Sequence, residues 1–77
     1  MSERSRYEYT VLFEPQDGGF AVIVPAIPEI CTFGETLEEA REMALEALRC
    51  YLESALKHGE PIPGDRAPRS EKLAVAV

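Results

Sequence analysis

Hydrophobic and polar residues alternate at the start of the chain, where residues 7–14 read YEYTVLFE. One side of an extended chain would carry Tyr7, Tyr9, Val11 and Phe13, and the other Glu8, Thr10, Leu12 and Glu14. A period of two in aromatic and β-branched residues is typical of a half-buried β-strand. The pattern therefore predicts a strand over residues 7–14.

Two further strands are predicted before residue 34. Asp17-Gly18-Gly19 tolerates positive φ angles and is typical of a hairpin turn. Residues 20–24 (FAVIV) are apolar on both faces, which indicates a central strand ended by Pro25. Residues 30–33 (ICTF) follow another proline and predict a short strand at the edge of the sheet.

One long helix is predicted from Thr36 to Lys57. Thr36 and Glu39 have the spacing of a capping box, and Gly59 is suited to the position just beyond the helix end. Apolar residues recur at steps of three and four, which indicates an amphipathic helix with one buried stripe. The members of that stripe are Leu37, Ala40, Ala44, Ala47, Leu48, Tyr51, Leu52 and Ala55.

The rest of the chain predicts a connector and a last strand. Residues 60–71 are rich in proline and cannot be helical. Residues 72–77 (KLAVAV) place three apolar side chains on one face, and we expect a strand that returns to the sheet, with an exposed tail as the alternative. The prediction is one α+β domain over residues 1–77, with its core in residues 7–59. Its order is β-β-β-α-β, with one helix on one face of a mainly antiparallel sheet.

The size and composition of the chain predict self-association and a cytoplasmic protein. A chain of 77 residues buries only about 60% of its unfolded surface, and no disulfide framework supports this one. We therefore expect a homo-oligomer. The charged N-terminus is not a secretory signal, and no apolar run approaches the roughly 18 residues of a membrane span.

Charge is distributed unevenly along the chain. The net charge is −6, and residues 7–40 hold seven acids and no Lys or Arg. Such a surface would repel phosphate backbones, so we expect no direct nucleic-acid binding. It would attract a basic protein partner. The alternative is a solvated surface with no partner. The candidate partner-binding residues are Asp17, Glu29, Glu35, Glu38 and Glu39.

No residue pattern predicts catalysis. A nucleophilic Cys31 would need a base nearby, yet the single histidine, His58, is predicted at the far end of the helix, and acids flank the cysteine. We interpret Cys31 and Cys50 as small packing residues and His58 as a partner of the last helical carbonyls. No metal set or phosphate loop is present in the sequence, so no catalytic residue and no cofactor is predicted, and we expect a protein that is not an enzyme.

The succession of motifs resembles the HicB-like antitoxin domain over about residues 7–63. The matching pieces are Tyr9-Thr-Val-Leu-Phe13, Asp17-Gly-Gly-Phe20, Val24-Pro25, Pro28-Glu-Ile-Cys-Thr32, Gly34-Glu-Thr36, Glu38-Glu-Ala40, a helix ending near Gly59, and Ile62-Pro63. The resemblance implies a partial ribonuclease-H-like fold. It also implies binding to a small basic HicA-like toxin, an mRNA-cleaving ribonuclease with a fold like that of double-stranded-RNA-binding domains, whose active face the antitoxin would cover.

The resemblance stops short of the fuller family pattern. Many HicB antitoxins carry a C-terminal segment that binds their own operator, whereas the residues after Ile62-Pro63 here have the pattern of a connector and a strand. We therefore expect no operator binding by these residues. The alternative function is that of a solitary homo-oligomeric structural or regulatory protein of the same fold, without a toxin.

Overall fold

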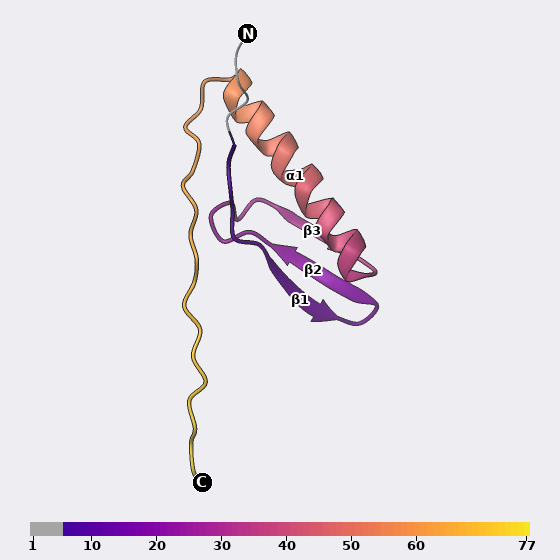
Figure 1. Ribbon diagram of the computed structural model, residues 1–77, viewed down its shortest axis with the longest axis vertical. Helices are drawn as coiled ribbons and strands as arrows, with labels where there is room; N and C mark the ends of the chain where they lie inside the picture. The colour runs from indigo at the N-terminus through magenta and orange to yellow at the C-terminus, as the bar shows by residue number, and fades with distance from the viewer. Residues whose placement is uncertain (1–5) are drawn as a thin grey trace.

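The computed structural model describes residues 6–77 (Figure 1). Three strands, β1 (Leu12–Gln16), β2 (Gly19–Ile23) and β3 (Cys31–Gly34), are followed by the helix α1 (Leu37–Lys57). The strands form an antiparallel sheet in the order β1-β2-β3, and α1 lies across one face of it. The predicted α+β class, the central position of the second strand and the edge position of the third are confirmed.

The strand register divides the sheet into two faces. Val22 pairs with Phe13 on one side and with Thr32 on the other, and this row faces the helix, where Val22 is buried. Side chains alternate between the faces along each strand. The neighbouring row of Leu12, Ile23 and Cys31 therefore points away from the helix, and all three residues are exposed.

The core is small and lies between the sheet and the N-terminal half of α1. Its buried members are Val22, Val24, Ile27, Ala40 and Ala44. Two alanines on the helix allow its backbone to come close to the sheet. A Cβ on Gly34 would lie 2.5 Å from the Cα of Ala40 and 2.9 Å from its Cβ. The chain therefore needs a glycine where β3 passes the first turn of the helix.

The helix begins with the predicted capping interactions. The Thr36 hydroxyl accepts a hydrogen bond from the backbone N–H of Glu39 at 3.0 Å. The Glu39 carboxylate reaches back and accepts from the N–H of Glu35 at 2.6 Å, one residue before the cap. The first bond satisfies a donor that the first helical turn leaves without an intrahelical partner, and the second satisfies the N–H of the residue before the cap.

The helix ends where the sequence predicted. Gly59 has a φ of 69°, and its N–H donates to the carbonyl of Leu56 at 3.3 Å. The N–H of Glu60 donates to the carbonyl of Ala55 at 2.8 Å, which completes a Schellman motif. The Nδ1 atom of His58 lies 2.8 Å from the carbonyl oxygen of Ser54, as expected for a residue that interacts with the last carbonyls.

The first strand is shorter than predicted. It begins at Leu12, which pairs with Ile23, the last residue of β2. Residues 7–11 lie outside the sheet, because the chain opposite them turns away after Val24 and Pro25 lacks an N–H donor. Their alternation is still used, since Tyr9 and Val11 pack against the core.

The buried stripe of the helix is also shorter than predicted, because Leu37 in the first turn is 42% exposed. It comes directly after the Thr36 cap, at the edge of the contact between the helix and the sheet. Ala40, Ala44 and Ala55 are buried as predicted.

The strand predicted over residues 72–77 is not part of the sheet. Residues 60–77 contain no helix or strand, and from residue 66 on the chain runs straight past the body and away from it (Figure 1). Leu73 and Val75 are more than 80% exposed. The radius of gyration is 15.4 Å, against about 11–12 Å for a compact chain of this length. The exposed tail, which the sequence left as the alternative, is what the structure shows.

Candidate functional site

Four of the five candidate carboxylates lie at one end of the sheet. Asp17 is in the turn between β1 and β2, and Glu35, Glu38 and Glu39 lie at the junction of β3 with α1. Phe20, which follows the turn, pairs with Gly34, which precedes the junction. The two segments are in close contact, because a Cβ on Gly19 would lie 2.8 Å from the Cα of Glu35. We call these four residues the acidic end.

The fifth candidate, Glu29, lies elsewhere. It comes just before β3, whose first residue, Cys31, pairs with Ile23 at the opposite end of β2 from Phe20. The length of β3 therefore separates Glu29 from the acidic end. Four of the five candidates named from the sequence therefore lie together, and Glu29 lies apart from them.

The four carboxylates of the acidic end have different roles. All four are exposed. Glu39 accepts the N–H of Glu35 and so takes part in capping the helix. Glu38 lies in the first helical turn, where the positive end of the helix dipole favours a negative charge. The capping bonds of Thr36 and Glu39 therefore remain when the other three carboxylates are removed, which are those of Asp17, Glu35 and Glu38.

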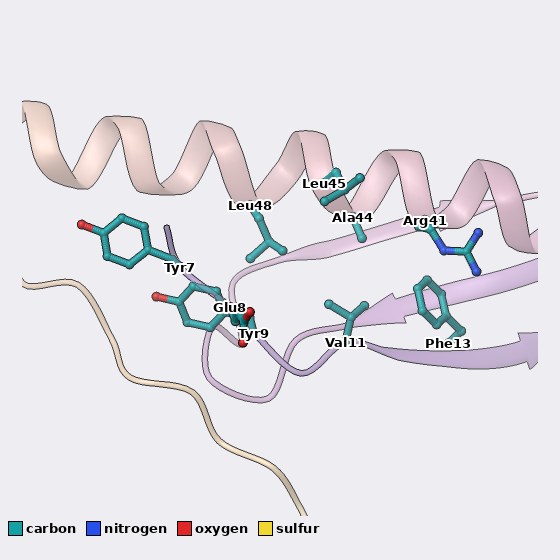
Figure 2. A pocket seen from close by; sticks show the side chains of 9 residues that line it. All are labelled: Tyr7, Glu8, Tyr9, Val11, Phe13, Arg41, Ala44, Leu45 and Leu48. Carbon is teal, nitrogen blue, oxygen red and sulfur yellow. The ribbon is translucent and has the colours of Figure 1, made fainter. Parts of the chain in front are cut away.

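A second feature is an apolar groove on the flank of β1 (Figure 2). It is open to solvent and has a volume of about 500 Å³. One wall comes from the segment that leads into β1, and the other from α1, as Figure 2 shows. We call it the β1 groove; its lining residues are Tyr7, Glu8, Tyr9, Val11, Phe13, Arg41, Ala44, Leu45 and Leu48.

The β1 groove exists because the helix is placed off the centre of the sheet. α1 packs mainly on β3 and β2, which leaves the flank beside β1 uncovered. Tyr7 is 41% exposed and Leu45 is 57% exposed in this open flank. The apolar face of residues 7–13 was predicted from the sequence, but the gap above it follows from the helix position.

Hydrogen bonds attach the connector to the chain that precedes β1. The Tyr9 hydroxyl donates to the carbonyl of Pro63 at 2.6 Å. The Asp65 carboxylate accepts from the N–H of Thr10 at 2.7 Å and from its hydroxyl at 2.8 Å. These bonds hold the pKa of Asp65 below its usual value, and burial raises the pKa of Tyr9. The sequence did not point to Asp65, because a contact across 55 positions leaves no local pattern.

The thiols and the histidine are not assembled into a site. Cys31 and Cys50 are free and exposed, so the interpretation of both as packing residues was wrong. The register explains Cys31, which lies in the row that points away from the helix. Within residues 6–77, no group of three or more His, Cys, Asp or Glu side chains could hold a metal ion. In the same range, no helix is both long and apolar enough to cross a membrane.

The chain is similar in sequence to known proteins over most of its length. Residues 9–74 match the model of the HicB-like antitoxins of bacterial toxin–antitoxin systems. A UPF0150 protein of Thermoplasma acidophilum is 46% identical over 61 residues, which cover 78% of this chain and 88% of that protein. A UPF0150 protein of Synechocystis is 38% identical over 58 residues, covering 74% of this chain and 73% of that one.

A longer relative carries the antitoxin name. Antitoxin HicB 1 of Photorhabdus laumondii is 48% identical over 56 residues, which are 71% of this chain and 36% of the antitoxin. The chain thus spans about a third of that relative. No solved structure matches the chain.

The chain forms a three-stranded antiparallel sheet with one capped helix, and antitoxin sequences match it along most of its length. It is therefore a domain of the antitoxin class of toxin–antitoxin systems. Within that class, it belongs to the HicB-like antitoxin family. The resemblance inferred from the motifs is therefore confirmed.

Proposed function

We propose that this protein acts as an antitoxin by binding a small basic toxin ribonuclease, similar to HicA, and covering its active face. The single observation that carries the proposal is the acidic end, in a chain of the HicB-like family. A basic ribonuclease would be drawn to this surface, which speeds the encounter of the two proteins. The protein contributes contact and charge to this complex, and the proposal assigns it no reaction.

The proposal places the contact at the acidic end and leaves Glu29 outside it. Exposed ion pairs contribute only about 0.2–1 kcal/mol each. Three such pairs would therefore shift the dissociation constant by about tenfold, and they would do so most strongly at low salt.

The test is binding to the product of the neighbouring gene, which the proposal expects to be a small basic protein. Asp17→Asn, Glu35→Gln and Glu38→Gln together should weaken the complex about tenfold at low salt and reduce the salt dependence of its affinity. A control with the same charge change, Glu29→Gln, Glu46→Gln and Glu53→Gln, keeps the acidic end intact and should bind almost as the parent does. Equal weakening by both sets would contradict the placement of the contact. If the parent formed no complex at low salt, the proposal itself would fail.

A second candidate function is that of a homo-oligomeric structural or regulatory protein without a toxin. The observation that favours it is the run of exposed apolar residues near the C-terminus, where Leu73, Val75 and Val77 are all more than 80% exposed. Light scattering together with the binding assay distinguishes the two, because an antitoxin can also be an oligomer. A stable oligomer that binds no neighbouring gene product supports the second function.

A further inference from the structure

Two features of the molecule, an open groove and an exposed segment that ends in apolar residues, do not meet within one chain. The first is the β1 groove, an open trough between α1 and residues 7–13. The second is the 66–77 segment, an extended chain that leaves the body (Figure 1). We propose that residues 72–77 of one chain form a fourth strand along β1 of a second copy, with Leu73, Val75 and Val77 in its β1 groove.

The pattern of the segment fits this position. Leu73, Val75 and Val77 lie on one face of an extended chain, and Ala74 and Ala76 lie on the other. A strand beside β1 would turn one face toward α1 and the other toward the open face of the sheet. The three larger side chains would then fill the groove, and the two alanines would face outward.

The edge of β1 is able to accept a strand. β1 is the outermost strand on its side of the sheet, so its outer backbone groups are free to pair with another chain. Pro15 lacks an N–H donor, which directs the pairing to the residues before it, 11–14. The segment has no proline after Pro68, so every residue from 69 to 77 keeps its backbone donor.

The attachment of the connector directs the segment away from its own groove. Tyr9 contacts Pro63 and Thr10 contacts Asp65, so the connector runs parallel to the chain that leads into β1. The chain then turns into β1, while the 66–77 segment continues straight past the sheet (Figure 1). Leu73 is eight residues beyond Asp65, so an extended segment can place Leu73 up to about 26–29 Å from the contact between Asp65 and Thr10.

Charge favours a second copy as the occupant. Residues 66–77 hold three cations (Arg66, Arg69 and Lys72) and one acid, a net charge of +2. Residues 7–60 hold three cations and eleven acids, a net charge of −8. The basic segment of one chain is therefore attracted to the acidic body of another. Two chains can exchange their segments by the same contact in both directions, which gives a closed dimer.

The first experiment tests which face of the segment forms the contact. Light scattering of the full chain should give the mass of two 8.6 kDa chains. Leu73→Asp with Val75→Asp should reduce it to the mass of one chain. Ala74→Asp with Ala76→Asp adds the same charge to the other face and should leave the dimer in place. All four residues lie in the exposed segment, so circular dichroism should show an unchanged fold. A monomeric parent, or equal loss of the dimer in both variants, would overturn the proposal.

The second experiment tests whether the occupant comes from another chain. Cys31→Ser and Cys50→Ser remove the native thiols. One preparation then carries Leu45→Cys in the groove, and another carries Val75→Cys in the segment. A short bis-maleimide should link the two chains after mixing, and Ala74→Cys in place of Val75→Cys should link several times less. A link that forms only within a chain carrying both cysteines, or no link at all, would overturn the proposal. Neither experiment depends on the toxin, so the inference can fail or hold separately from the proposed function.

Discussion

The carboxylate of Asp65 accepts two hydrogen bonds from Thr10, at 2.7 Å from its backbone N–H and at 2.8 Å from its hydroxyl. The two residues are 55 positions apart, and their contact joins the connector to the segment that leads into β1. Beside it, the Tyr9 hydroxyl donates to the carbonyl of Pro63. This attachment determines where the 66–77 segment leaves the body, and so which neighbouring surface the segment can reach.

The Asp65 contact predicts a pH dependence. Its hydrogen bonds with Thr10 lower the pKa of Asp65 in the folded protein below the usual 3.8. A group with a lowered folded pKa stabilises the folded state above its unfolded pKa, and this contribution is lost as the pH falls through the folded pKa. The Thr10 amide resonance should therefore titrate in NMR spectra with a midpoint below 3.8. Asp65→Asn should abolish that titration, and a midpoint at or above 3.8 would contradict the contact.

Gly34→Ala should destabilise the fold strongly. The added Cβ would lie 2.5 Å from the Cα of Ala40, where backbone at the start of the helix has to move. Overpacking of this kind costs about 1–3 kcal/mol in the free energy of unfolding, measured by urea denaturation. Gly64→Ala is the control, because an added Cβ there has no heavy atom within 4 Å. Similar losses in both variants would show that the clash is not the cause.

Thr36→Ala should weaken the start of α1. The substitution removes the hydroxyl that accepts the N–H of Glu39, and loss of such a cap costs about 0.5–2 kcal/mol of stability. Thr36→Ser keeps the hydroxyl and should retain most of the stability. Chemical denaturation followed by circular dichroism measures the difference. The interpretation would be wrong if the serine variant lost as much stability as the alanine variant.

Ile27→Ala should cost far more stability than Ile23→Ala. Ile27 is 1% exposed and belongs to the core, whereas Ile23 is 36% exposed on the face of the sheet away from the helix. Truncation of a buried isoleucine typically costs about 2–5 kcal/mol, and much of that cost comes from the cavity left behind. Urea denaturation of the two variants provides the comparison. Equal losses would mean that the open face of the sheet is covered in solution.

Local patterns in the sequence were sufficient for the helix with both its ends, for the hairpin turn and for the existence of the first three strands, but not for where the first strand begins or for residues 72–77. The alternation over residues 7–14, the turn at Asp17 and the spacing of Thr36 and Glu39 each depend on neighbours within a few positions. Such short-range rules are encoded directly in residue type, as are the caps and the glycine at position 59. The motif series was also sufficient to indicate the HicB-like family, which the match over residues 9–74 confirms.

The tertiary structure decided how the candidate surfaces are arranged. The strand register brings Asp17 to the junction that carries Glu35 and leaves Glu29 at the other end of the sheet. The register also turns Cys31 to the open face, against the expectation that it would pack. The contact between Thr10 and Asp65 holds the chain just before the 66–77 segment, and the segment runs past the sheet from there (Figure 1). Each of these results depends on contacts between residues far apart in the chain, which a reading of local periodicity does not contain.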